Sequence, residues 1–280
     1  MVSENNNYFT NRKLTNFEKF HKINELKKLS KGENVKIAII DSGISPDIHI
    51  DKKEEMDMFN KGGVVEDGAG HGTAVASIIK RIAPNAEIYD FKVLDKNGVG
   101  TSGTVSDGFN LAKAWDVDIA TISLGANHLG QSMVFENSLN ALRKNKTIIL
   151  GATGNNGHNG IDYPARYKDV WAIGSVNEKG DRSKFSNYGE VDFVALGEKL
   201  PTLSQDNNLI YKTGTSFSIP VMAGILALVM GHAKKHLIDT KSIDWYDLLK
   251  QGSYFSHSRS DFGNGYPRGD LLKKLISSLA

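Results

Sequence analysis

Residues 211–231, YKTGTSFSIPVMAGILALVMG, contain a glycine turn followed by the longest apolar run of the chain. Residues 209–212 are typical of a short strand, and the turn TGTS at 213–216 ends it. We therefore predict a buried helix with Ser216 in its first turn, and Pro220 lies early enough in that helix to be tolerated. A serine there faces free backbone N–H groups and the positive end of the helix dipole, which favour a negative oxygen. Serine is also a common N-cap, so this stretch alone leaves a capping role open.

The composition excludes several classes of protein. Lys plus Arg is 34 and Asp plus Glu is 32, so no charge excess indicates nucleic acid or membrane as a partner. The absence of cysteine excludes a disulfide framework and thiolate metal sites. The N-terminus lacks the apolar segment of a secretory signal, and the run at 221–230 is too short for a membrane span. We expect a soluble, cytoplasmic protein that contacts neither nucleic acid nor membrane.

The order of apolar segments predicts an α/β fold. Residues 35–40, VKIAII, form a continuous apolar run that ends at Asp41, which is typical of a strand covered on both faces of a parallel sheet. Further strands are expected at 86–94, 119–124 and 147–152, and helices from residue 71 and at 103–115 and 134–144. This alternation predicts a mainly parallel sheet. Ligands of such sheets bind at the carboxyl ends of the strands, where Asp41 is expected.

The other segments complete one predicted domain. Residues 14–31 have the apolar spacing of one amphipathic helix, and residues 44–70 are expected to form a loop. Strands at 170–176, 191–196 and 209–212 have little helix between them, so we expect a more antiparallel return of the chain. Helices are expected at 242–250 and 270–279. Without repeats or linkers, we divide the chain into an N-terminal extension, 1–32, and one main domain, 33–280.

Three residue types of nucleophilic catalysis stand at the ends of these elements. Asp41 follows a strand, His71 opens a helix in GHGTAVA at 70–76, and Ser216 opens another. A serine nucleophile needs a base to take its proton and a carboxylate to hold that base in the right tautomer. The chain order Asp, His, Ser is one of the known orders for this geometry.

The three segments resemble the signature blocks of the subtilisin-like serine proteases, or subtilases: IIDSGI at 39–44, HGTAVA at 71–76 and GTSFSIP at 214–220. The resemblance extends from about residue 33 to the C-terminus, and includes KVL at 92–94, SLG at 123–125, GATGNNG at 151–157, YPA at 163–165 and GNG at 263–265. It implies a three-layer fold with a mainly parallel central sheet flanked by helices. It also implies a serine endopeptidase that works through an acyl-enzyme.

The resemblance assigns a role to each catalytic residue. Ser216 resembles the nucleophile, His71 the general base and acid, and Asp41 the residue that orients His71. Asn155 resembles the side-chain amide of the oxyanion hole, where the backbone N–H of Ser216 is the second donor. A neutral amide can donate to a developing oxyanion without carrying charge itself.

The resemblance also implies substrate contacts. Two backbone edges would pair with an extended peptide or protein substrate: Gly98, Val99 and Gly100 on one side, and Ser123, Leu124 and Gly125 on the other. Ala152, Thr153 and Gly154 would line the site. Asp162 would lie at the base of the pocket for the side chain before the scissile bond, where a carboxylate favours Arg or Lys. The alternative is that Asp162 is solvated or paired with Arg166.

Departures from the family pattern concern metal and layout. The segment between His71 and Pro84 is too short for the calcium-binding loop of extracellular relatives, so we predict that the strong calcium site is absent and that no cofactor is required. A weak cation site is left as an alternative. About thirty residues precede the catalytic block, too few for a propeptide domain. The layout resembles cytoplasmic members, such as intracellular subtilisins or the leader peptidases that trim modified peptides.

Three other interpretations remain. The glycine-rich segment 151–157 is similar to a dinucleotide-binding loop, but residues 157–164 do not suit the helix that such a loop requires. An inactive or self-blocked subtilase-like peptide-binding protein, with its N-terminal segment in the cleft, is the non-enzyme alternative. His232 and His236 have the i, i+4 spacing of a metal pair, but the neighbouring lysines favour a solvated helix end.

Overall fold

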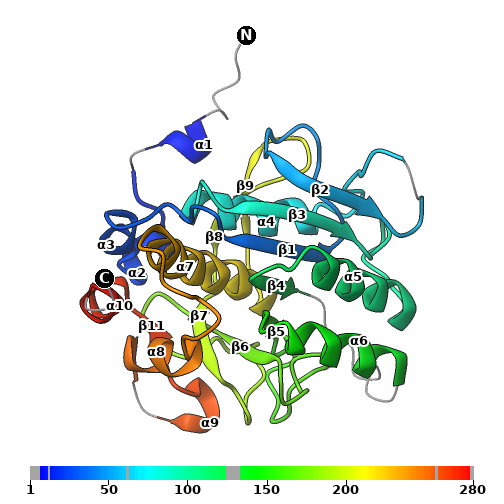
Figure 1. The fold of residues 1–280 in the computed structure, drawn as a ribbon. Coiled ribbons are helices and arrows are strands. Elements are labelled where there is room, and N and C mark those ends of the chain that lie inside the picture. Colours follow the sequence, from blue (N-terminus) through cyan, green and yellow to red (C-terminus); the bar gives the residue numbers. More distant parts are fainter. Residues whose placement is uncertain (1–6, 12, 61–62, 124–132, 256–257, 278–280) are drawn as a thin grey trace.

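The computed structural model describes residues 7–11, 13–60, 63–123, 133–255 and 258–277. Its centre is a seven-stranded sheet in the order β2-β3-β1-β4-β5-β6-β7, in which every neighbouring pair is parallel (Figure 1). The predicted α/β fold with a mainly parallel sheet is therefore confirmed. The strands are β1 (Lys36–Asp41), β2 (Lys52–Asp57), β3 (Glu87–Lys92), β4 (Ile119–Ile122), β5 (Ile148–Ala152), β6 (Trp171–Val176) and β7 (Phe193–Leu196).

Helices cover both faces of the sheet and make the three layers. Helices α4 (His71–Ile82) and α7 (Thr215–Lys235) lie on one face, and α5 (Ser102–Ala114) and α6 (Met133–Lys144) on the other (Figure 1). Successive side chains of a strand point to opposite faces. In β1, Ile37 and Ile39 accordingly join the core under α4 and α7, whereas Ala38 and Ile40 join the core under α5 and α6. This two-sided burial explains the uninterrupted apolar run of β1.

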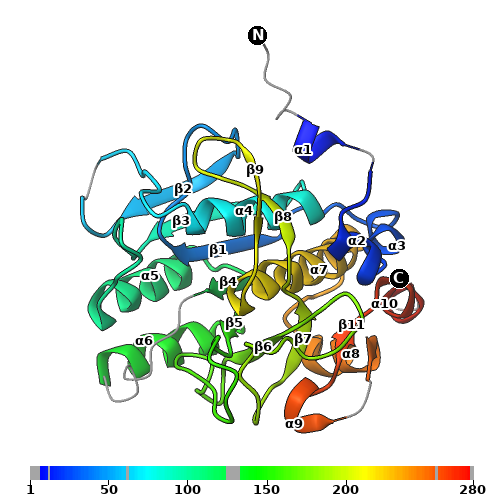
Figure 2. The ribbon, with the colours of Figure 1, turned by 180° about the vertical axis from the view of Figure 1, so that it is seen from behind.

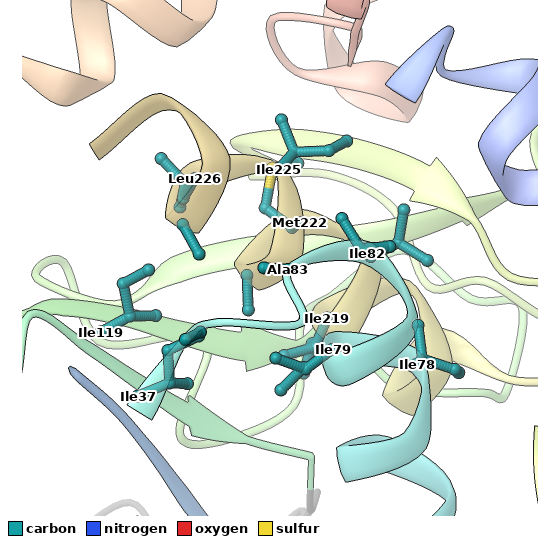
Figure 3. Close-up of a cluster of buried hydrophobic side chains, with 14 of the residues drawn as sticks. Ile37, Ile78, Ile79, Ile82, Ala83, Ile119, Ile219, Met222, Ile225 and Leu226 are labelled. Carbon is teal, nitrogen blue, oxygen red and sulfur yellow. The ribbon is translucent and has the colours of Figure 1, made fainter. Parts of the chain in front are cut away.

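Helix α7 is the core helix predicted from residues 211–231. It is long and apolar enough to cross a membrane, but 94% of its apolar window is buried inside the protein. Figure 3 shows its Met222 and Ile225 packed near Ile79 and Ile82 of α4. A Cβ on Gly224 would lie 2.7 Å from Ile82 Cβ, so the glycine permits the close approach of the two helices. This packing holds the N-termini of α4 and α7, and with them His71 and Ser216, on one rigid scaffold.

The single helix predicted at 14–31 is wrong, because the chain turns at its centre. After α1 (Asn7–Thr10), the structure has two short helices, α2 (Asn16–Phe20) and α3 (Ile23–Lys27), separated by Lys22 with a φ of 53°. Between them, His21 Nδ1 lies 2.7 Å from the Pro267 carbonyl oxygen, and His21 Nε2 accepts a hydrogen bond from the Leu196 N–H (3.1 Å). These long-range hydrogen bonds outweigh the continuation of one helix.

Two other sequence predictions are corrected. The predicted loop at 44–70 contains β2, an edge strand whose charged residues suit one unpaired, solvent-facing edge. Strands β6 and β7 continue the parallel sheet rather than returning antiparallel. Only the last part of that prediction holds: β9 (Leu209–Lys212) pairs antiparallel with the unpredicted β8 (Leu200–Leu203) in a separate hairpin (Figure 2).

Short elements close the fold beside α2 and α3. The apolar side of the N-terminal extension, including Phe17, Ile23 and Leu26, is buried in the same core as α7. Helices α3 and α10 lie side by side (Figure 1). The closing elements are α8 (Trp245–Gln251), β10 (Ser253–Tyr254), α9 (Arg259–Phe262), β11 (Tyr266–Pro267) and α10 (Gly269–Ile276).

A buried arginine fastens the N-terminal extension. Arg81 donates hydrogen bonds to the carbonyl oxygens of Tyr8, Asn11 (2.7 Å) and Lys13 (2.8 Å), and it pairs with the buried Glu18 (3.2 Å). Arg81 lies in the last turn of α4, whereas His71 is the first residue of that helix. The described residues of the extension are therefore held at the end of α4 remote from His71.

Candidate active site

The structure places Asp41 and His71 in direct contact. Asp41 is the last residue of β1 and His71 the first of α4, and His71 Nδ1 lies 2.8 Å and 3.0 Å from the two carboxylate oxygens of Asp41. Asp41 is 1% exposed and His71 27% exposed at their side chains. With the Nδ1 proton directed to Asp41, Nε2 is left as the atom that can accept and return a proton.

Opposing charges act on the His71 imidazole. Burial lowers the pKa of His71, but the carboxylates of Asp41 and, to a smaller extent, Asp67 raise it, whereas Lys212 lowers it. The net result is a pKa of His71 above its ordinary value. Neither Asp67 nor Lys212 was singled out in the sequence, because Asp67 lies in a predicted loop and the residue directly before α4 is Gly70.

The first turn of α7 contacts three other parts of the site through consecutive residues. The Thr215 N–H donates to Asn155 Oδ1 (2.9 Å), and the Ser216 hydroxyl donates to the Ser123 carbonyl oxygen (2.9 Å). The ring of Phe217 lies 5.2 Å from the His71 ring, centroid to centroid. Ser216 therefore stands between the amide of Asn155, the end of β4 and the imidazole.

The turn before α7 requires a glycine. Gly214 has a φ of 148°, a region that residues with a side chain rarely adopt, and its N–H donates to the Gly197 carbonyl oxygen (2.9 Å). In the first turn of α7, the Thr215 N–H donates to Asn155 Oδ1 and the Phe217 N–H to the Gly214 carbonyl oxygen, so among the described residues the Ser216 N–H is left as a donor for another group. Such a helix N-terminus stabilises a negative oxygen.

The Ser216 hydroxyl donates to a backbone carbonyl that, according to the resemblance, would pair with the substrate. Ser123 directly follows β4, and its carbonyl oxygen accepts a hydrogen bond from the Ser216 hydroxyl. If a substrate N–H donated to this carbonyl oxygen instead, the Ser216 hydroxyl would be free to donate to His71. The neighbouring predicted substrate residues Leu124 and Gly125 lie outside the described residues.

The other predicted backbone edge is an exposed loop after β3. Asp95 Oδ1 accepts hydrogen bonds from the N–H groups of Asn97 and Val99 (2.9 Å each), which lowers the pKa of Asp95. Val99 is 61% exposed, and a Cβ on Gly100 would lie 2.5 Å from the Val93 carbonyl oxygen. Gly98 has a φ of 73° in the same turn. Strands β3 and β4 flank β1, so this loop and Ser123 follow strands on either side of Asp41.

Asp162 is a buried carboxylate against the glycine-rich segment. It is 9% exposed, and a Cβ on Gly154, whose φ is 107°, would lie 2.2 Å from Asp162 Oδ2. Asn187 Nδ2 donates to Asp162 Oδ1 at 3.4 Å. Burial raises the pKa of Asp162, and the nearby His158 partly offsets this effect. A small cationic group is the species that would best compensate such a carboxylate.

The alternatives for this region do not match the structure. The Arg166 guanidinium lies over the Tyr163 ring, 5.7 Å from its centroid, instead of pairing with Asp162. Ala152 and Thr153 are buried at the end of β5, and no helix occurs between residues 153 and 170, all of which the structure describes. The dinucleotide-binding interpretation therefore lacks the helix it requires.

The structure offers little for a bound metal. Among the described residues, no group of three or more His, Asp or Glu side chains is arranged to hold an ion. Residues 83–86 join α4 to β3 and contain no carboxylate, so this connection does not suit the hard cation of the family's calcium loop. His232 is buried, with its ring 4.5 Å from that of His236, so the predicted solvated helix end is wrong for His232.

A groove lies away from the candidate site residues. Its volume is about 920 Å³, and it separates the N-terminal extension from the β8–β9 hairpin. None of the candidate site residues lines it, although Tyr8, Arg81 and Tyr211 do. The shape of this groove therefore points away from the candidate site, whose polar groups lie at the carboxyl edge of the sheet.

Comparison with known proteins gives consistent matches. Residues 32–251 match the model described as the subtilase family. The thermostable alkaline protease of Halalkalibacterium halodurans is 33% identical over 246 residues, which are 84% of this chain and 66% of the relative. The alkaline protease of Alkalihalobacillus alcalophilus and subtilisin Savinase of Lederbergia lenta are each 33% identical over 218 residues, 71% of this chain. These matches cover 54% and 77% of the two relatives, respectively.

A solved structure has the same fold over nearly the whole chain. It is described as the crystal structure of a lanthipeptide protease, and it superposes with a TM-score of 0.84. The match covers 98% of this chain and 95% of that one at 21% sequence identity. At this identity, the likeness concerns the fold.

Proposed function

Because the chain belongs to the subtilase family, we propose that it is a serine endopeptidase that hydrolyses peptide bonds through an acyl-enzyme on Ser216. The observation that carries the proposal is the first turn of α7. Its consecutive residues Thr215, Ser216 and Phe217 contact Asn155, Ser123 and His71. A nucleophile, a base held by a carboxylate and an amide donor therefore converge on one small volume.

Acylation begins when an extended substrate pairs with the backbone edges at Gly98–Gly100 and Ser123. The substrate N–H donates to the Ser123 carbonyl oxygen in place of the Ser216 hydroxyl. The hydroxyl then donates to His71 Nε2. His71 removes the proton as Oγ attacks the scissile carbonyl carbon. The oxyanion that forms accepts hydrogen bonds from Asn155 Nδ2 and the Ser216 N–H. His71, held by Asp41, then returns the proton to the leaving amine.

Deacylation repeats these steps with water. The leaving amine departs, and a water molecule gives a proton to His71 Nε2 as its oxygen attacks the acyl carbon. The same two donors stabilise the second oxyanion. Collapse of this intermediate breaks the bond to Ser216 Oγ, which regains the proton from His71. No metal is needed at any step.

Asp162 supports cleavage after a basic residue. Its carboxylate is buried, and the Asn187 amide is the hydrogen-bond donor that contacts it. An Arg or Lys side chain in the pocket would neutralise the buried charge, whereas an apolar side chain would leave it uncompensated. The preferred substrate is thus an extended peptide with a basic residue before the scissile bond.

The biological role we favour is the trimming of a dedicated peptide or leader in the cytoplasm. The solved structure that shares the fold is itself described as a lanthipeptide protease. The cysteine-free composition suits a reducing compartment, and the short connection between α4 and β3 suits a protease without the strong calcium site.

A cleavage profile tests the proposal. The purified protein and its Ser216→Ala variant are incubated with a mixed peptide library, and cut sites are read by mass spectrometry. Cuts after Arg or Lys that the variant lacks are expected. Cuts after apolar residues would support the protease function but reject the proposed role of Asp162 in specificity. Equal cleavage by the variant would reject Ser216 as nucleophile.

Absence of cleavage would favour the self-blocked or inactive peptide-binding alternative. The described part of the N-terminal extension is bound by Arg81 at the far end of α4, which does not support blocking by residues 7–11 and 13–32. An Arg81→Leu variant would loosen this segment. Activity that appears only in that variant would support self-blocking.

A further inference from the structure

Asp67 is a buried carboxylate in the loop before α4, and its two oxygens accept four hydrogen bonds. Oδ1 accepts from the Ser42 hydroxyl (2.7 Å) and from the N–H groups of Gly70 (2.7 Å) and Ala69 (3.2 Å). Oδ2 accepts from the Thr73 N–H (2.9 Å). Asp67 is 5% exposed, so these groups replace water around its charge.

These bonds connect the segments that carry Asp41 and His71. Ser42 follows Asp41, donates its N–H to Asp41 Oδ1 (2.7 Å), and accepts the Gly72 N–H on its hydroxyl oxygen (2.9 Å). A Cβ on Gly72 would lie 2.3 Å from the Gly43 carbonyl oxygen, so the loop after β1 touches the first turn of α4. Asp67 thus accepts hydrogen bonds from both segments at the point where they meet.

We propose that Asp67 is a positioning residue for the reaction, a second carboxylate that holds the Asp41 loop against the first turn of α4 and directs its negative charge at His71. This inference rests on the proposed protease function, but its geometry is independent of any substrate. A carboxylate that caps the N-terminus of α4 also interacts favourably with the helix dipole.

The charge of Asp67 acts on the pKa of His71 together with those of Asp41 and Lys212. Asp41 approaches from β1, Asp67 from the loop before α4 and Lys212 from β9. Asp41 and Asp67 raise the pKa of His71, and burial and Lys212 lower it. Removing the charge at Asp67 while keeping its shape should therefore lower the pKa of His71, whereas loss of the Ser42 hydroxyl should leave the Asp67 charge in place.

The first test is an NMR titration of His71 in Ser216→Ala protein, which needs no turnover. The His71 signal is assigned with a His71→Gln variant, and Asp67→Asn is expected to move its titration to lower pH. Asp57→Asn is the matched control, because Asp57 is also buried and accepts the Phe59 N–H (2.8 Å), but it is not among the charges that chiefly shift the pKa of His71. A titration that moves no more than in the control overturns the electrostatic part of the proposal.

The second test separates the charge from the hydrogen-bonded link by kinetics. In active protein, Ser42→Ala should lower kcat/KM roughly ten- to a hundredfold by misplacing Asp41 and His71, and it should move the acidic limb of the pH profile less than Asp67→Asn does, because the Asp67 charge stays in place. Asp67→Asn should lower kcat/KM and also move that limb to lower pH. If Asp67→Asn does not fold, Asp67→Glu must keep the wild-type limb. Unchanged kcat/KM in Ser42→Ala, or a displaced limb in Asp67→Glu, overturns the proposal.

The two tests distinguish this inference from the proposed function. Inactive wild-type protein whose His71 titration still responds to Asp67→Asn would reject the protease function and keep the interaction. Active wild-type protein whose His71 titration does not respond to Asp67→Asn would support the protease function and reject the interaction.

Discussion

The side-chain oxygen of Asn155 lies 2.9 Å from the backbone nitrogen of Thr215, the residue before Ser216. The Thr215 hydroxyl donates to the same oxygen at 3.1 Å. Because Oδ1 is thus held by the start of α7, the amide nitrogen of Asn155 is the atom left for a substrate. The proposed nucleophile, Ser216, and the proposed oxyanion donor, Asn155, are therefore positioned by the same helix end.

Replacing Asn155 by Ala should lower kcat roughly 100- to 1,000-fold with little change in KM, because the lost hydrogen bond forms fully only in the transition state. Steady-state kinetics on one cleaved peptide measures both constants. Asn156→Ala is the matched control, because this neighbouring side chain is exposed. A rise in KM at constant kcat would show that Asn155 binds the ground state instead.

Asp162→Ser should weaken the proposed preference for basic residues before the scissile bond. Loss of one partner of a buried charge pair costs about 2–5 kcal/mol, so the ratio of kcat/KM for Arg over Leu peptides should fall roughly 30-fold or more. Asp169→Asn, which removes a carboxylate paired with Arg143 at 2.7 Å, is the control. An unchanged ratio in Asp162→Ser would place the specificity determinant elsewhere.

Lys212→Gln should move the acidic limb of the kcat/KM profile to higher pH. Lys212 lowers the pKa of His71, so its removal lets the imidazole hold its proton to a higher pH and reduces the neutral base available. The effect should shrink at high salt, since Lys212 is partly exposed. Lys199→Gln, an exposed lysine next to β8, should leave the profile in place. A shift to lower pH would contradict the sign of the Lys212 effect.

His21 should make the fold sensitive to mild acid. Burial, assisted by Arg268, lowers the pKa of His21 to about 4 from an ordinary 6.5. Between these values the unfolded chain binds a proton that the folded chain does not, so stability is complete above pH 6.5 and falls as the pH drops towards 4. Each pH unit in this window costs at most about 1.4 kcal/mol, or roughly 3 kcal/mol in total.

Urea unfolding across this pH range measures the His21 effect. The His21→Gln variant should be less stable at neutral pH, because the contacts with Pro267 and Leu196 are disturbed, but its stability should depend less on pH. His49→Gln alters an exposed histidine and should keep the wild-type slope. Equal slopes in wild type and His21→Gln would exclude His21 as the titrating group.

Chelation should leave thermal stability nearly unchanged, because residues 83–86 provide no carboxylate for a calcium loop. Melting curves with and without EDTA test this. An ion site held at 100 times its Kd would contribute about 2.7 kcal/mol, and its loss would lower Tm by several degrees. A drop of that size, reversed by added calcium, would reveal a site that the sequence did not predict.

Much of the architecture was predictable from the sequence, because its cause is local. The consecutive apolar residues at 37–40 require cover on both faces, and Ile37 and Ala38 do lie in separate cores. A glycine turn before a long apolar run likewise requires a buried helix, with Ser216 in its first turn. The order of Asp41, His71 and Ser216 at the ends of these elements follows directly from this pattern.

Other features depended on contacts between distant segments. The hydrogen bonds of His21 to residues 175 and 246 positions away divide the predicted N-terminal helix. The charged β2 is a strand only because β3 provides its partner. The orientation of β6 and β7 also depends on where the chain crosses the sheet, which apolar periodicity does not specify.

The sequence by itself determined which residue types stand at the ends of the strands and helices, because burial and turn formation act on neighbouring residues. Only the tertiary structure decided which of these ends meet. Asp67 accepts from the Ser42 hydroxyl, Asn155 from the Thr215 N–H, and Asn187 donates to Asp162, across separations of 25 to 60 residues. Such hydrogen bonds exist only after the sheet and its helices have packed, since packing brings the partners together and excludes the water that would otherwise replace them.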